Sequence, residues 1–173
     1  MARVSTKENK NIYQQLREAQ KWSREKASEE MEGIQADRIE RIESGKSNAH
    51  PDEVVIMAEK YKAPQLCNYY CANECEIGKQ YVPEVKMKDL TQIVLEMLSS
   101  LNSAKKKQER LIEITADGQI EDDEIEDFID IQDELEKMSL TVESLRLWSE
   151  KMLAEGKIDI EAYKRTKAKR KEK

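Results

Sequence analysis

The sequence predicts an all-α protein, on the basis of its composition and the spacing of its apolar residues. Charged residues make up 38% of the 173 residues and aromatic residues 5%, with only five Gly and three Pro. So few helix breakers favour helices, and no run of alternating β-branched residues predicts a strand. We expect a helical N-terminal domain (1–66), a Cys-containing junction (67–82), a long antiparallel, coiled-coil-like helical hairpin (83–160) and a basic tail (161–173).

Several classes of protein are not expected. No apolar stretch approaches the roughly 18 residues that span a bilayer, and the N-terminus lacks the apolar core of a signal peptide. We therefore expect a cytoplasmic protein without membrane contact, whose three Cys are not structural disulfides. The sequence has a single His and no Gly-rich phosphate loop, so we expect neither enzyme activity nor a cofactor.

The charges are strongly segregated along the chain. Residues 1–66 are neutral, residues 113–136 hold twelve acidic residues and no basic one, and residues 164–173 hold seven basic residues. This basic end could attract phosphate or could simply be solubilising, and it is expected to be disordered or loosely helical.

The N-terminal domain is expected to begin with a helix over 11–20 that turns Ile12, Leu16 and Ala19 inward. Trp22 then provides an apolar anchor. A second helix follows Ser23, which is a suitable N-cap. Its inward residues are Ala27 and Met31.

Gly33 supplies the next turn, where a positive φ costs little. The third helix is expected to bury Ile34, Ile39 and Ile42 and to stop at Gly45. Pro51 opens a fourth helix. The core candidates of this helix are Val54, Val55, Met57 and Ala58.

These segments carry a family resemblance. The elements that match are Arg17, the pair Trp22-Ser23, Gly33, the block Ile39-Glu40-Arg41-Ile42-Glu43-Ser44-Gly45-Lys46, and the Pro-led helix after it. Together they resemble the Cro/phage-repressor-like (XRE-family) helix-turn-helix domain, over about 55 residues. The resemblance implies a five-helix repressor-like domain and a sequence-specific transcriptional regulator that binds double-stranded DNA.

The resemblance also implies roles for individual residues. Residues 35–43 would be the recognition helix in the major groove, and Arg41 is the best candidate for a base edge or a phosphate. Arg17 and Glu43 match an internal ion pair of the family. The full set of expected DNA-binding residues is Ser23, Arg24, Gln35, Ala36, Asp37, Arg38, Arg41, Ser44 and Lys46.

Two features depart from the family pattern. One additional residue lies between Arg17 and the turn, so the second helix is expected to extend to Glu32. Asp37 and Glu40 place carboxylates on the expected DNA face, where they repel phosphate. A protein-interaction module that keeps the fold without binding DNA therefore remains an alternative.

The junction contains three regularly spaced cysteines. A helix is expected from Pro64 to Gly78, with Cys67, Cys71 and Cys75 along one stripe. They could be buried structural thiols, or they could serve a thiol- or metal-gated regulator with His50 or an external fourth ligand. The spacing C-x3-C-x3-C matches no standard metal signature.

The C-terminal region carries two heptad-like apolar series. They are Leu90, Val94, Met97, Leu101, Ala104 and Leu111, then Phe128, Ile131, Leu135, Met138, Val142, Leu145 and Met152. Such seams predict two helices in an antiparallel hairpin, and a homodimer could bury the face left open. An intramolecular hairpin without oligomerisation is the alternative. The Asp117-Gly118 turn between the helices is a poor match to a calcium loop.

Overall fold

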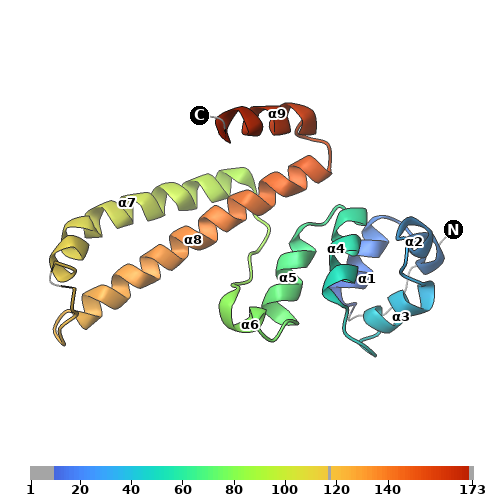
Figure 1. Cartoon of the computed structure of the whole chain (residues 1–173), viewed down its shortest axis with the longest axis horizontal. Coiled ribbons are helices and arrows are strands. Elements are labelled where there is room, and N and C mark those ends of the chain that lie inside the picture. The colour runs from blue at the N-terminus through green and yellow to red at the C-terminus, as the bar shows by residue number, and fades with distance from the viewer. Residues whose placement is uncertain (1–9, 117, 172–173) are drawn as a thin grey trace. The chain divides into compact units, whose positions relative to one another are not determined.

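The computed structural model describes residues 10–116 and 118–171, and all its regular elements there are helices, so the all-α prediction is confirmed (Figure 1). The chain divides into two compact units. One comprises Met1–Glu84 with Glu150–Lys173, and the other comprises Val85–Ser149. The expectations for residues 1–9, Asp117 and residues 172–173 lie outside the described residues.

The first unit contains a succession of short helices. They are α1 (Ile12–Ala19), α2 (Arg24–Glu30), α3 (Ala36–Glu43), α4 (Pro51–Lys60), α5 (Gln65–Asn73), α6 (Gly78–Tyr81) and α9 (Ile160–Lys171). The core of this unit is a single apolar cluster to which α2, α3 and α4 contribute the predicted residues. These are Ala27, Met31, Ile34, Ile39, Ile42, Val54, Met57 and Ala58.

Two predictions about the core were wrong. Val55 is 58% exposed, because α4 turns Val54 and Met57 inward and leaves the intervening position on the outside. On α1 the predicted Ile12 and Leu16 do pack against the core, partly buried, but Ala19 is exposed. The fully buried residues of α1 are Tyr13, Gln14 and Arg17. The polar side chains are buried there because they find partners inside the domain.

The helix ends follow local chemistry. The Ser23 side chain accepts a hydrogen bond from the Lys26 amide at 3.1 Å, as predicted for an N-cap. Gly33 and Gly45 have φ values of +95° and +71°, the left-handed region that glycine adopts most readily. The second helix ends at Glu30, so the predicted extension to Glu32 was wrong, and that residue lies in the turn.

The junction also differs from the prediction. The helix expected to reach Gly78 ends at Asn73, and Gly78 begins α6 instead. A Cβ at Gly78 would lie 2.0 Å from the Cys71 carbonyl oxygen, so only glycine allows the two segments to approach this closely.

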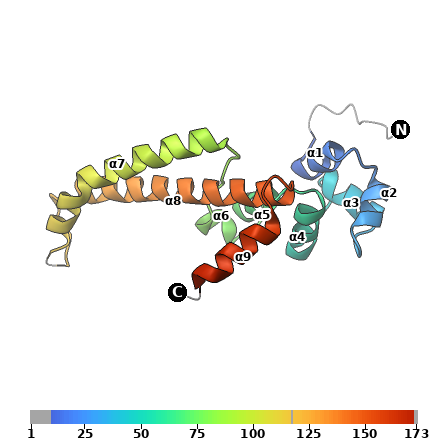
Figure 2. The same cartoon turned by 90° about the horizontal axis from the view of Figure 1, so that it is seen from above.

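The second unit is the predicted hairpin. Its helices α7 (Leu90–Ile114) and α8 (Ile125–Ala154) run side by side and antiparallel in both views (Figures 1 and 2). Ion pairs between Lys107 and Asp130 (3.2 Å) and between Arg110 and Asp127 (2.6 Å) define the register. Gly118 has a φ of +76°, as expected for the turn between the helices.

The predicted heptad seams do not coincide with the contact between α7 and α8. Of the predicted residues, Ile131 is buried, whereas Leu90, Val94, Leu101, Leu135 and Val142 are exposed. The buried positions include Ile93, Ser100, Glu134, Thr141 and Ser144 instead. The helices are rotated relative to the predicted packing. Part of each predicted series therefore lies in the contact between α7 and α8, and the rest is exposed to solvent.

The basic tail follows one of the two expected alternatives, disordered or loosely helical. Residues 160–171 form the continuous helix α9. Lys, Arg, Ala and Glu, which are good helix formers, make up most of this stretch, and Lys167 lies over the Tyr163 ring at 5.7 Å.

Candidate functional site

The candidate site is the outer surface of α3 together with the segments that hold this helix in place. Ile39 and Ile42 anchor α3 in the core, at 1% and 3% exposure. Asn11 also donates a hydrogen bond from Nδ2 to the Ile42 carbonyl at 2.8 Å. The opposite surface of the helix is consequently fixed in direction and open to solvent.

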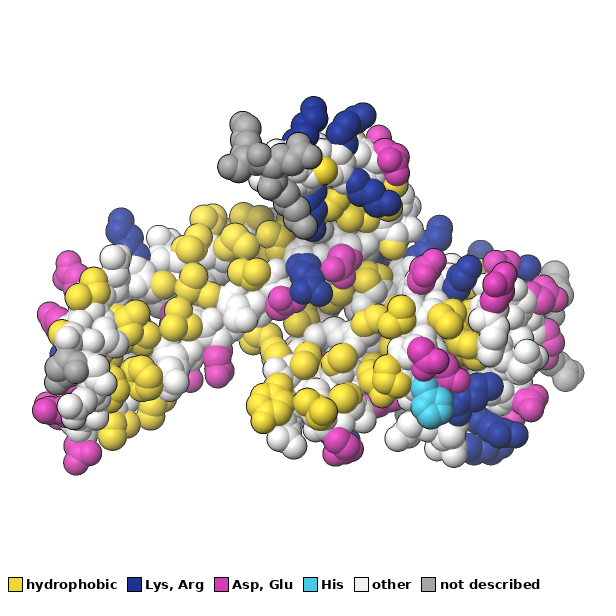
Figure 3. Space-filling view, in the orientation of Figure 1, with side chains coloured by type: hydrophobic (Ala, Val, Ile, Leu, Met, Phe, Trp, Pro, Cys, Tyr) yellow, Lys and Arg dark blue, Asp and Glu magenta, His cyan; other side chains and the backbone are white. Residues whose placement is uncertain are grey.

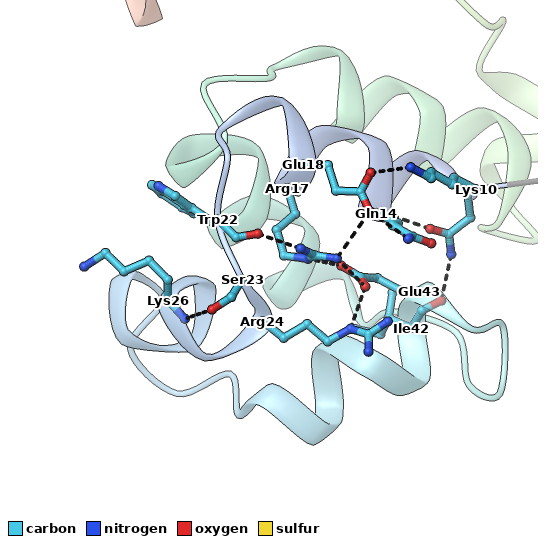
Figure 4. Close-up of polar contacts among 11 residues, drawn as sticks. Lys10, Gln14, Arg17, Glu18, Trp22, Ser23, Arg24, Lys26, Ile42 and Glu43 are labelled. Carbon is cyan, nitrogen blue, oxygen red and sulfur yellow. Dashed lines mark hydrogen bonds and ion pairs between the residues drawn. The ribbon is translucent and has the colours of Figure 1, made fainter. Parts of the chain in front are cut away.

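A buried ionic cluster ties α3 to α1 and α2 (Figure 4). The Glu43 carboxylate accepts hydrogen bonds from Arg17 Nε at 2.5 Å, Arg17 Nη2 at 3.0 Å and Arg24 Nε at 2.8 Å. Arg17 also donates to the Trp22 carbonyl at 2.6 Å. Burial alone would lower the pKa of Arg17, but the hydrogen bond and charge of Glu43 outweigh it, and the pKa is raised. The expected Arg17–Glu43 ion pair is therefore present.

The structure gives Arg38 a role within the domain. Its guanidinium forms a two-pronged ion pair with Glu53 at 2.7 Å and also donates to Ser47 Oγ and to the Asn48 carbonyl. Glu53 in turn accepts from the His50 amide at 2.7 Å. The Arg38 hydrogen bond holds the pKa of Glu53 below its usual range, although burial opposes this shift. Arg38 thus connects α3 to the start of α4.

The remaining charged residues of the expected DNA face are exposed, and each basic side chain has an acidic neighbour. Arg41 lies 4.0 Å from Asp37, with side-chain exposures of 61% and 79%. Lys46 lies 3.2 Å from Glu40, with exposures of 65% and 41%. Pairs this exposed are weak and break readily.

The other residues expected to bind DNA differ in their exposure and in their contacts within the domain. Gln35 is the N-cap of α3, and its exposed side chain makes no capping hydrogen bond. Ala36 opens the helix and is half-buried, and Ser44 is exposed at the opposite end. Arg24 is 38% exposed and uses Nε for Glu43, and Ser23 is occupied in capping α2.

The three cysteines are free thiols on or beside α5, and each is half-buried. Burial raises the pKa of Cys67. Across residues 10–116 and 118–171, no three His, Cys, Asp or Glu side chains converge closely enough to hold a metal ion. Metal gating remains a hypothesis that no contact in the described structure favours.

Sequence reasoning did not find every residue that shapes the site. The roles of Asn11 and Glu53 were missed, since both act through contacts with residues far along the chain. A signal existed for Glu53, because a Glu two residues after Pro51 sits at the position where a side chain can cap its own helix.

Comparisons with protein-family models, with curated proteins and with solved structures found no match for this chain. Within the described residues, no helix combines the length and the apolar character needed to cross a membrane. The structure therefore defines an all-α fold, and the function is argued from the site itself.

Proposed function

We propose that the chain is a sequence-specific DNA-binding transcriptional regulator that inserts α3 into the major groove. The observation that carries the proposal is the exposed guanidinium of Arg41 on a helix whose other side is firmly anchored. Its ion pair with Asp37 spans 4.0 Å and lies in solvent, so the side chain can turn to a base or phosphate at little cost. The resemblance to the XRE family agrees with this role.

Different residues would supply different kinds of contact. Arg41 suits a guanine edge, because a guanidinium donates two parallel hydrogen bonds to O6 and N7. Lys46 and Ser44 at the end of α3 suit phosphate oxygens. Arg24 keeps its terminal nitrogens available for a phosphate while Nε holds Glu43. Such a regulator would act in the cytoplasm, next to the DNA.

The acidic residues on the same face make the binding selective. Asp37 and Glu40 repel phosphate, so this surface has little general affinity for DNA. A carboxylate can instead accept from the N4 amino group of cytosine. We therefore expect weak non-specific binding and a clear preference for particular sequences.

The proposal is tested by recovering fragments of genomic DNA with the full chain. Wild type should enrich a defined set of fragments, and Arg41→Ala should lose this enrichment, since a bidentate base contact accounts for about 1–3 kcal/mol of discrimination. Lys60→Ala, an exposed change at the end of α4, should behave as wild type. Equal recovery by wild type and Arg41→Ala would refute the proposal.

A protein-interaction module is the second candidate, and the charge balance of α3 favours it. Two acidic and two basic side chains alternate on the exposed surface, as in many protein contacts. Such a module would show no enrichment of DNA at low salt. A positive DNA result whose affinity falls steeply with salt would rule this candidate out.

A further inference from the structure

The hairpin leaves a row of large apolar side chains without cover. On α7 these are Leu90, Val94, Leu98, Leu101 and Ile112, with exposures between 39% and 61%; on α8 they are Ile125, Leu135 and Val142, with exposures between 45% and 57%. We call these eight residues the apolar face. All of them belong to the unit Val85–Ser149.

Helix geometry places the two rows on the same side of the hairpin. At 3.6 residues per turn, the exposed row on α7 is rotated by about a quarter turn from the residues of α7 that face α8. The exposed row on α8 is rotated by a similar angle, in the same sense, from the residues of α8 that face α7. Because the helices are antiparallel, these two rotations lead to the same side. Figure 3 shows hydrophobic side chains along both helices on the side nearest the viewer.

The rows also match in height along the hairpin. The ion pairs Lys107–Asp130 and Arg110–Asp127 fix which residues lie level with each other. Counting from these pairs, Ile112 is level with Ile125, Leu101 with Leu135, and Val94 with Val142. Six of the eight residues of the apolar face therefore form three pairs at matching heights on the two helices.

The opposite side of the hairpin is polar. An open cavity there is lined by Lys88, Glu96, Ser99, Ser100, Ser103, Glu134, Lys137, Leu140 and Thr141. The Lys88–Glu96 ion pair, at 2.6 Å, lies beside it. The two sides of the hairpin thus differ sharply, and one of them resembles half of a protein core.

The size of the apolar face fits an interface. Eight large apolar residues, each between 39% and 61% exposed, together present several hundred Å², which is the order of the ~800 Å² that each partner buries in a standard interface. Since Val94 and Leu101 on α7, and Leu135 and Val142 on α8, are each seven residues apart, a second pair of helices is a cover that fits this part of the face.

Two unpaired charges at the outer edges favour a second copy of the same chain as the cover. Lys105 lies at the outer edge of α7, and Glu136 lies at the outer edge of α8 about one helical turn away in height. Both are exposed, and within the described residues neither forms an ion pair. A lysine on one edge and a glutamate on the other can therefore pair with a second copy.

We propose that two copies pack their apolar faces together and form a four-helix bundle about a two-fold axis parallel to the helices. This axis lays α7 of each copy against α8 of the other and keeps the heights of the residues unchanged. Lys105 of each copy then faces Glu136 of the other. The polar cavities remain on the outside of the bundle, in water.

The first test measures the mass of the full chain by light scattering and sedimentation. Wild type should have twice the monomer mass of 20.2 kDa. Val94→Asp with Leu101→Asp should weaken association by roughly 100-fold, because two charges would be buried without partners. Circular dichroism should show unchanged helix content, as both residues are exposed in the single hairpin.

The matched control places the same two charges on the opposite side, as Ser99→Asp with Ser103→Asp, and should remain dimeric. A monomeric wild type, a larger assembly, or a Val94/Leu101 variant that stays dimeric would overturn the proposal. These measurements use no DNA, so they stand or fall separately from the proposed function.

A second test addresses the direction of packing. Lys105→Glu in one chain, and Glu136→Lys in another, should each weaken the homodimer. When the two variants are mixed, both edges regain opposite charges, so native mass spectrometry should find mostly mixed dimers. A mixture without this preference would overturn the proposed axis.

Discussion

Glu43→Ala would isolate the effect of the buried ionic cluster under α3. The carboxylate is 1% exposed and accepts three hydrogen bonds from Arg17 and Arg24. Its removal would leave the Arg17 guanidinium buried without a counter-charge, which costs about 3–5 kcal/mol of unfolding free energy. Arg24→Ala should cost less than about 1 kcal/mol, since that side chain is 38% exposed and solvent screens its pair.

The paired replacement Arg17→Met with Glu43→Leu should be milder than Glu43→Ala alone. It removes both charges, which is often close to neutral. It also leaves the Trp22 carbonyl without its donor, which costs about 1–3 kcal/mol. The double variant therefore separates the effect of an unpaired charge from the effect of lost packing.

The assay is urea unfolding followed by the fluorescence of Trp22, whose ring lies 6.0 Å from that of Tyr61 in the core. Trp148→Phe as the common background removes the second tryptophan, so the signal reports the N-terminal unit. The reasoning would be refuted if Glu43→Ala and Arg24→Ala lost similar stability, or if the double variant were the least stable.

Three further predictions concern other parts of the first unit. Gly78→Ala should cost roughly 1–3 kcal/mol in urea unfolding, because the new Cβ would meet the Cys71 carbonyl oxygen; an unchanged midpoint would contradict this. The pKa of Glu53 is lowered in the folded state by Arg38. Its stabilising effect should therefore be complete above about pH 4.3 and should fade as the pH falls through the folded-state value, so wild type and Glu53→Gln should converge in stability at acid pH; a constant difference would count against the ion pair. Burial raises the pKa of Cys67, so it should be alkylated by iodoacetamide more slowly than the other two cysteines, and equal rates by mass spectrometry would show otherwise.

The elements that local chemistry determines could be predicted from sequence. Ser23 caps α2, Gly33 and Gly45 adopt positive φ, and Pro51 opens α4. In each case the residue's own conformational preference decides the outcome. The third helix was also placed correctly, because its isoleucines recur at helical spacing.

The features that depend on distant partners could not be predicted in the same way. Gln14 and Arg17 are buried because α1 packs over α3, which apolar spacing alone does not indicate. The rotation of the hairpin helices was missed for a related reason. Each helix has a wide apolar sector, and the sequence does not say which part of it faces the neighbouring helix.

The same limit applies to the candidate site. Arg38 was assigned to DNA from its position in the expected recognition helix, yet its guanidinium is held by Glu53 and by the loop after α3. Its part in DNA binding stays a prediction, as do those of the other residues on this surface. The exposure and pairing of the charged side chains of α3 depend on the loop that follows this helix. The spacing of residues within α3 does not predict the conformation of that loop.

The carboxylate of Glu53 contacts both Arg38 on α3 and the first turn of α4. It binds Arg38 and also the His50 amide at the start of α4, with both distances at 2.7 Å. A ligand that drew Arg38 away would loosen the first turn of α4, and the energy of that loosening would be subtracted from its affinity. By thermodynamic reciprocity, anything that displaced the loop of residues 47–50 would release Arg38 for binding. We therefore expect binding by Arg38 to be coupled to the conformation of residues 47–50.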